Sequence, residues 1–348
     1  PSFPSCAMDG IAVKSYDTFG ATERSPVTLA KEQYVAVNTG NPVPGGCDAV
    51  IMVEKLNQAD DGGVVIHEAM SPWRNVRQVG ENAVNGAMLL PINAVITPAA
   101  AALFLSAGVL AVTVRRRAKV AVIPTGDELT PPDAPQEGKV PETNSTLISA
   151  TLKLWGMEPT VWPIVRDNRQ AIKEAVLEAV AHHDMVLLNA GSSAGTKDYS
   201  ADIVQKNGEL TVHGVELRPG KPLLLGVVKG KAVAGLPGYP VAALVDLDYF
   251  VKPLLFSLCG KTEGPHRVIE AVAASTISSK LGDEEHLRGK LTPIGGVTHF
   301  TPLPRGSAAL GSAVDADGVA LIAPDTEGVM EGEKLKVRLT DSCPPMEQ

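Results

Sequence analysis

The sequence has 348 residues, of which 44% are hydrophobic and 20% are charged, and its formal net charge is −8. Such a composition is typical of a globular protein of about two to four domains. The negative charge counts against a surface built for nucleic acid or an anionic membrane, so any anionic ligand must be held by a local cluster of basic residues.

The cysteines and the chain ends set further limits. The four cysteines are widely spaced and include no C-x-x-C pair. This spacing disfavours structural zinc, iron–sulfur clusters and a disulfide framework, and it indicates a reducing cytoplasm. No stretch reaches the length of a transmembrane helix, and no signal peptide is visible. The chain begins with Pro1 rather than methionine, so we expect that an amino-terminal piece precedes it.

Short apolar runs between Gly- and Pro-rich turns dominate residues 1–95, for example "YVAVNTG" and "CDAVIMVEKL". They predict a mainly-β amino-terminal domain. A helical pattern follows in "TPAAAALFLSAG", with Thr97 as its N-cap, Pro98 at its first position and Gly108 closing it. We expect this helix to form a linker over residues 96–117.

Residues 118–262 alternate strand and helix patterns. One predicted helix is capped by Asn144 and closed by Gly156, and a second covers residues 168–183. Strands separated by helices of this length indicate a central α/β domain with a parallel sheet covered on both faces. Residues 263–348 return to short strands and predict a small carboxyl-terminal β-barrel. The second helix has an apolar face made of Ile172, Ala175, Val176, Ala179 and Val180.

Four polar, Gly-rich stretches follow or precede predicted strands of the α/β domain: "IPTGDEL", "NAGSSAGTKDYS", "ELRPGKPLL" and "GLPGYP". Because ligands of open parallel sheets bind at the carboxyl edge, we expect these stretches to converge there. The candidate residues are Thr125, Gly126, Asp127 and Glu128 in the first stretch, Gly191, Ser193, Gly195 and Asp198 in the second, Arg218, Gly220 and Lys221 in the third, and Pro237, Gly238, Tyr239 and Pro240 in the fourth.

The chemistry of these stretches suits a phosphate ligand. Backbone N–H groups in such turns cradle phosphate, but one helix terminus contributes only about 0.3–1 kcal/mol, so Lys221 and Arg218 are needed as well. The carboxylates Asp127, Glu128 and Asp198 would repel a bare phosphate and accept one that shares a Mg²⁺ ion with them. Each stretch taken singly also fits a purely structural turn, and no histidine is placed to activate a serine of "GSS".

Several motifs, in this order, carry a resemblance: "PSCAMDGIAV", "NTGNPVPGGCDAVIMVE", "VRQVGENAVNGAMLLP", "VAVIPTGDEL", "TNSTLISATLKLWG", "GSSAGTKDY", "LRPGKPLLLG" and "GLPGYPVAAL". Together they resemble the molybdopterin molybdenumtransferase family, the bacterial MoeA proteins related to the carboxyl-terminal domain of gephyrin. The resemblance covers nearly the whole chain. Members of that family begin with a helical segment ahead of the M-D-G motif, and this sequence lacks it.

The resemblance implies an activity, a metal and an assembly. The implied reaction inserts molybdate into adenylyl-molybdopterin and gives the molybdenum cofactor and AMP, assisted by Mg²⁺. Matched by position, Asp9, Glu128, Asp198 and Lys221 are the implied catalytic residues, and Asp127, Glu128 and Asp198 are the implied metal ligands. The family also implies a cytoplasmic homodimer with a shared active site, transient contacts with other proteins of molybdenum-cofactor biosynthesis, and no partnership with nucleic acid or membrane.

Five positions depart from the family pattern. Arg218 stands where lysine is usual, Tyr239 where asparagine is usual, and Ala242 where serine is common. Ala190 replaces a glycine, and Asn82 replaces a carboxylate. These departures keep open a non-enzymatic protein that binds molybdopterin or the molybdenum cofactor. A molybdopterin adenylyltransferase is a further alternative, which the flanking β domains argue against. The choice between molybdate and tungstate stays open, because both are tetrahedral dianions of nearly equal size.

Overall fold

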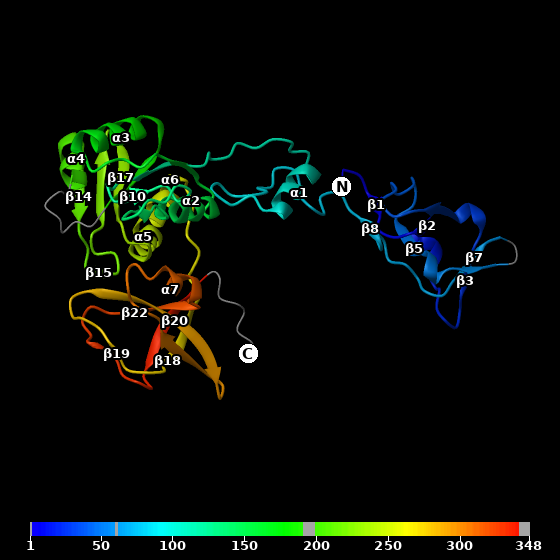
Figure 1. The fold of residues 1–348 in the computed structure, drawn as a ribbon. Coiled ribbons are helices and arrows are strands. Elements are labelled where there is room, and N and C mark those ends of the chain that lie inside the picture. Colours follow the sequence, from blue (N-terminus) through cyan, green and yellow to red (C-terminus); the bar gives the residue numbers. More distant parts are fainter. Residues whose placement is uncertain (1, 60–61, 191–198, 341–348) are drawn as a thin grey trace. The chain divides into compact units, whose positions relative to one another are not determined.

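A computed structural model describes residues 2–59, 62–190 and 199–340 of the chain. The contacts divide the chain into two compact units, Pro1–Val114 and Arg115–Gln348, each of which is described by itself (Figure 1). Among the residues described, no helix is both long and apolar enough to cross a membrane.

The first unit consists of small antiparallel sheets, as the short apolar runs predict. Its core gathers the inward side chains of Ile11, Leu29, Ile51 and Ile66. The strands are β4 (Tyr34–Val37), β2 (Gly10–Val13) and β5 (Ala49–Met52) in one sheet, β3 (Val27–Leu29), β7 (Val64–Ile66) and β6 (Asn57–Gln58) in another, and β1 (Ser5–Cys6) with β8 (Val76–Arg77); short 3₁₀ turns η1 (Ser15–Thr18), η2 (Lys31–Gln33) and η3 (Val53–Lys55) lie between them.

Helix α1 (Pro98–Ser106) forms where its capping residues predict. The Thr97 hydroxyl accepts a hydrogen bond from the backbone N–H of Ala100 at 3.2 Å. Gly108 follows the helix with a φ of +78°, the left-handed conformation that ends helices. The helix is therefore closed at both ends by its own sequence.

The second unit contains a six-stranded central sheet in the order β12-β9-β13-β17-β16-β14. The strands are β12 (Glu158–Val161), β9 (Lys119–Pro124), β13 (Met185–Ala190), β17 (Lys231–Pro237), β16 (Leu224–Val228) and β14 (Gly208–His213). The first four are parallel, as expected, whereas β16 runs antiparallel to both of its neighbours, β17 and β14. The reason is local. Only Lys229 and Gly230 join β16 to β17, and both have positive φ (49° and 75°), the geometry of a tight hairpin turn.

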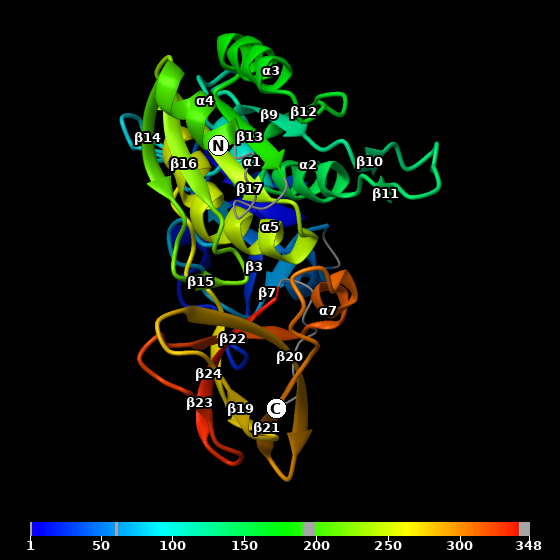
Figure 2. The same cartoon turned by 60° about the vertical axis from the view of Figure 1, so that its left-hand side comes forward.

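Helices cover both faces of this sheet, as Figures 1 and 2 show. Strand β9 alternates between the faces, with Val120 and Val122 packed under α2, α5 and α6, and Ala121 and Ile123 under α3 and α4. The helices are α2 (Asn144–Leu154), α3 (Arg169–His182), α4 (Tyr199–Asn207), α5 (Pro240–Asp246) and α6 (Lys252–Leu258), with a π-helical segment η4 (Leu247–Val251) and a small pair, β10 (Leu129–Thr130) and β11 (Val140–Pro141). The five residues of the predicted apolar face of α3 are all buried.

The cap predicted for α2 is wrong. Thr143, not Asn144, is the N-cap residue, and the Glu142 carboxylate accepts a hydrogen bond from the backbone N–H of Ser145 at 2.9 Å. A buried acid at the start of the helix therefore performs the capping. This arrangement leaves the side chain of Asn144 available for other contacts.

The carboxyl-terminal strands form the expected β-barrel (Figure 2). Strand β20 pairs with both β21 and β22, so the five strands β20-β21-β18-β24-β22 close on themselves around Phe300. One strand of this sheet, β15 (Leu217–Arg218), comes from the α/β part of the chain and pairs in parallel with β20, with Leu217 opposite Glu284. The remaining bounds are β18 (Val268–Ala273), β19 (Ile277–Ser278), β20 (Glu284–Ile294), β21 (Val297–Pro302), α7 (Leu310–Asp315), β22 (Gly318–Ile322), β23 (Gly328–Val329) and β24 (Lys334–Leu339).

Candidate functional site

The ends of three parallel strands are tied together at the carboxyl edge of the central sheet. The backbone N–H of Thr125, after β9, donates to the carbonyl of Asn189 on β13 at 2.9 Å. The Asn189 side chain in turn donates to the carbonyl of Pro237 at the end of β17, at 2.8 Å. Two of the four Gly-rich stretches, "TGDEL" and "LPGYP", therefore lie at one edge, on either side of β13.

Asn144 completes this network. Its amide donates to the Asn189 side-chain oxygen at 2.9 Å and to the Gly238 carbonyl at 2.8 Å. Both asparagines are buried, at 6% and 3% exposure. Sequence reasoning missed them as a pair, although an asparagine at the end of the apolar run "MVLLNA" was an available signal.

A pair of acids faces the same edge. Asp127 and Asp167 exchange hydrogen bonds, each backbone N–H donating to the other's carboxylate at 3.4 Å. Glu128 folds back toward Gly126, where an added methyl group would lie 2.7 Å from its carboxylate oxygen. Asp167 was not predicted; it follows the predicted strand "TVWPIV" at the sheet edge, and its position there was the signal.

These acids suit a hard cation. Mg²⁺ is commonly held by one or two carboxylates together with substrate phosphates, and Asp127 with Asp167 offers such a pair. Within residues 2–59, 62–190 and 199–340, no group of three His, Cys, Asp or Glu residues forms a complete metal cage. The predicted residues Gly191, Ser193, Gly195 and Asp198 lie outside the described residues.

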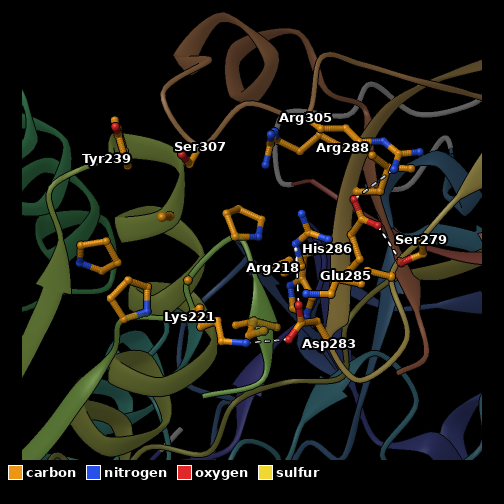
Figure 3. A pocket seen from close by; sticks show the side chains of 18 of the residues that line it. Arg218, Lys221, Tyr239, Ser279, Asp283, Glu285, His286, Arg288, Arg305 and Ser307 are labelled. Atoms are coloured by element: carbon orange, nitrogen blue, oxygen red, sulfur yellow. Dashed lines mark hydrogen bonds and ion pairs between the residues drawn. The ribbon is translucent and has the colours of Figure 1, made fainter. Parts of the chain in front are cut away.

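A cavity of about 740 Å³ opens between the α/β part of the second unit and the barrel (Figure 3). The predicted Arg218, Gly220 and Lys221 line one wall with Pro237 and Tyr239 of the "LPGYP" turn. The barrel supplies the other wall, which includes Ser279, Asp283, Glu285, His286, Arg288, Arg305 and Ser307. The cavity is therefore rich in basic side chains.

Arg288 is the most deeply buried cation of this wall, with 5% exposure. Its Nε donates to the Ser312 hydroxyl at 2.8 Å and one terminal nitrogen donates to the Pro304 carbonyl at 3.4 Å. The other terminal nitrogen has no partner, and no carboxylate pairs with Arg288 among the residues described. Burial lowers its pKa, but an arginine side chain stays charged at neutral pH. Nothing in the motif "EEHLRGK" marked it in the sequence.

Three other basic residues of the cavity, which Lys280 also lines, already have acidic partners. Lys221 Nζ lies 3.1 Å and Arg218 Nε 3.8 Å from the Asp283 carboxylate. Arg305 lies 3.4 Å from Glu285. Of these four side chains, Arg288 is the one whose charge gains most from a ligand anion, because a buried charge without a counter-ion is costly.

The turn that carries Lys221 rests on a second buried acid. An added methyl group at Gly220 (φ +126°) would lie 2.2 Å from Asp246 Oδ1, so only glycine fits there. Asp246 is fully buried, and neither of its carboxylate oxygens has a hydrogen-bond partner among the described residues. Burial raises its pKa to about 8, which makes the group predominantly neutral at pH 7.

The "LPGYP" turn begins α5. Pro240 is the first helical residue, and Tyr239 is the N-cap residue without a capping side-chain hydrogen bond. The tyrosine ring is 54% exposed and lines the cavity, as does Ala242 on the first turn of the helix. Tyr239 is therefore accessible to a ligand held over this turn.

Asp9 belongs to the first unit. Its carboxylate accepts a hydrogen bond from the backbone N–H of Thr39 at 2.6 Å, and this bond lowers its pKa. Val53 donates to the backbone carbonyl of Asp9 at 3.0 Å. Within its own unit, Asp9 therefore ties the M-D-G turn to the loop that carries "NTGN".

Comparison with known families gives a consistent assignment along the chain. Residues 1–108 match the MoeA N-terminal region, residues 121–257 a probable molybdopterin binding domain, and residues 270–340 the MoeA C-terminal region. Molybdopterin molybdenumtransferase 2 of Mycobacterium tuberculosis is 31% identical over 97% of this chain and 88% of its own length. The Haemophilus influenzae molybdopterin molybdenumtransferase is 31% identical over 83% and 75%.

Two crystal structures of molybdopterin biosynthesis MoeA proteins from Pyrococcus horikoshii have the same fold, with TM-scores of 0.79 and 0.76 and identities of 31% and 26%. Both alignments cover 97% of this chain, and they cover 87% and 88% of the archaeal chains. These matches run through all the domains and lie at identities that show common ancestry. The chain therefore belongs to the MoeA family, the family of the molybdopterin molybdenumtransferases.

Proposed function

We propose that this protein is a molybdopterin molybdenumtransferase, which inserts molybdate into adenylyl-molybdopterin and releases AMP. The observation that carries the proposal is the cavity beside the Pro-Gly-Lys-Pro turn, with Arg288 buried in its wall and without a carboxylate partner within residues 2–59, 62–190 and 199–340. Such a guanidinium is a candidate site for a tetrahedral oxyanion or a phosphate, because one terminal nitrogen keeps its donors and the buried charge lacks a counter-ion among the described residues.

The chain's own residues divide the work between two places. In the cavity, Arg288, Lys221 and Arg218 bind and orient anionic groups of the two substrates. At the sheet edge, Asp127 and Glu128, joined by Asp167 and the sequence-predicted Asp198, would hold a Mg²⁺ ion. When bound, that ion would neutralise charge on the diphosphate that links AMP to the pterin. Positioning and electrostatics thus supply the catalysis.

A second candidate function is binding of the pterin cofactor without turnover. Tyr239, half exposed at the cavity wall, favours it, since an aromatic ring there can stack on a pterin. An adenylyltransferase is the third candidate. We further propose that the protein works in the cytoplasm as a homodimer in which Asp9 serves the partner subunit's site, and that it passes its product to other proteins of the same biosynthesis.

One assay separates the three functions. Purified protein is mixed with adenylyl-molybdopterin, molybdate and Mg²⁺, and AMP release is followed with and without molybdate. Release that depends on molybdate supports the transferase. Retained pterin binding without release supports the binding protein, and adenylylation of molybdopterin from ATP supports the adenylyltransferase. The same assay with tungstate tests the choice of metal oxyanion.

A further inference from the structure

Asp283 of the barrel lies between the two basic residues of the Pro-Gly-Lys-Pro turn. Its carboxylate is 3.1 Å from Lys221 Nζ and 3.8 Å from Arg218 Nε, and the three side chains converge in Figure 3. In the part of the chain that the structure describes, neither basic side chain has another hydrogen bond or ion pair. One carboxylate therefore serves both.

The three side chains differ greatly in exposure. The Asp283 side chain is 8% exposed, whereas those of Arg218 and Lys221 are 49% and 62% exposed. The acid lies at the base of the group and the basic ends face the open cavity. An ammonium group has three donors and a guanidinium has five, so both keep donors free after contacting Asp283.

The acid is also held more firmly than its partners. It precedes β20 directly, and the backbone N–H of the next residue, Glu284, donates to the Glu216 carbonyl at 2.9 Å. The pairing of β15 with β20 places Leu217 opposite Glu284, next to Arg218. Asp283 is therefore fixed in register with the turn, whereas the long basic side chains can reorient in solvent.

We propose that Asp283 is a positioning residue, a buried counter-ion from the barrel that aims Arg218 and Lys221 into the cavity. This proposal rests on the proposed function, because it concerns the same anion-binding site. An alternative role is that of an internal competitor, which occupies the two basic residues until a ligand displaces it. The geometry favours positioning, since the carboxylate is buried behind the basic groups and a ligand can reach their free donors without displacing it.

The test measures binding of inorganic pyrophosphate by calorimetry, with EDTA present so that no metal bridge contributes. The variants are Asp283→Glu, which keeps the charge and displaces the carboxylate by one methylene, and Asp283→Asn, which keeps the shape and removes the charge. Each is also made in a Lys221→Met background. Glu270→Gln is the matched control, because it removes one negative charge from the same barrel in an exposed pair with Lys334.

Positioning predicts that Asp283→Glu weakens binding about tenfold, the loss expected when two long side chains must be ordered by the ligand itself. Asp283→Asn weakens it less, about threefold, because removing a nearby negative charge offsets part of the loss. In the Lys221→Met background, the effect of Asp283→Glu falls to about threefold or less, since only Arg218 is left to position. Glu270→Gln binds as the wild type does.

Different results would overturn different claims. Tighter binding by Asp283→Asn, with Asp283→Glu equal to wild type, would show a competitor and end the positioning role. An effect of Asp283→Glu that is unchanged in the Lys221→Met background would show a general structural role, and melting temperatures of all variants identify a folding defect. If Lys221→Met alone leaves pyrophosphate binding unchanged, the proposed anion site itself is wrong and the inference falls with it.

Discussion

Replacing Asp246 with asparagine should stabilise the protein at neutral pH. The carboxyl is fully buried and has no hydrogen-bond partner in the part of the chain that the structure describes, and burial raises its pKa from 3.8 to about 8. The folded state therefore holds this proton more tightly than the unfolded state does. The stability contributed by the bound proton is complete below pH 3.8 and is lost progressively as the pH rises to about 8. Asparagine has nearly the same shape and no charge to bury.

The size of the effect follows from the distance between the two pKa values. One pKa unit corresponds to about 1.36 kcal/mol, so the wild-type protein loses about 4 kcal/mol of this stabilisation between pH 4 and pH 7. About 1 kcal/mol more is lost up to pH 8, where the loss levels off. Asp246→Asn should lose none of it. The advantage of the variant is thus close to zero at pH 4 and grows with pH.

Urea unfolding at pH 5, 6, 7 and 8 measures this difference. Trp155 and Trp162 belong to the α/β region around Asp246, so a Trp73→Phe background confines the fluorescence signal to that region. The difference in unfolding free energy between Asp246→Asn and its parent should rise with pH and flatten near pH 8. A difference that is the same at every pH, or a variant less stable at pH 7, would refute the argument that Asp246 is buried as a neutral acid.

Three further outcomes are expected. Asn189→Ala should lower the unfolding free energy by about 2–3 kcal/mol, because it removes the side-chain partner of two buried groups, the Pro237 carbonyl at a strand end and the Asn144 amide at a helix start. Urea titration beside Asn168→Ala, which removes an exposed helix cap, checks this difference. Tyr239→Asn should weaken pterin binding by about 1 kcal/mol if the ring stacks on the ligand, whereas equal affinity and rate would show a ring that touches no ligand. Asp9→Asn and Asp198→Asn, each inactive alone, should recover roughly a quarter of wild-type activity when their subunits exchange in full-length protein, because half the dimers are mixed and each has one intact site. A mixture that stays inactive despite exchange shown by sedimentation contradicts the shared site.

Sequence patterns predicted the fold well where local rules decide it. The apolar face of α3 and the caps of α1 follow directly from spacing and capping chemistry. The antiparallel β16 was missed because "VVKGKA" was not read as a hairpin, although two residues cannot cross over to a parallel strand. Asn144 was misassigned because a capping residue and a core-linking residue look alike in sequence.

The site residues likewise include some that local sequence patterns could predict and some that they could not. The turns containing Thr125 and Pro237 were predictable, because strand ends in a parallel sheet share an edge. Arg288 and Asp283 could not be predicted, since both belong to the barrel and reach the cavity only through tertiary packing. No periodicity or motif near them in the sequence predicts that they line the cavity.

The pairing of β15 with β20 has a consequence for how such proteins can recombine during evolution. The other strands of the barrel lie in one continuous part of the chain, which makes the barrel look like an independent domain. Two residues of the α/β region nevertheless form a strand of its sheet. A barrel exchanged between relatives must restore the alignment of Leu217 with Glu284, or an open strand edge is exposed on each side of the junction. Shuffling of this barrel should therefore succeed only when the short segment before the Pro-Gly-Lys-Pro turn is inherited with it.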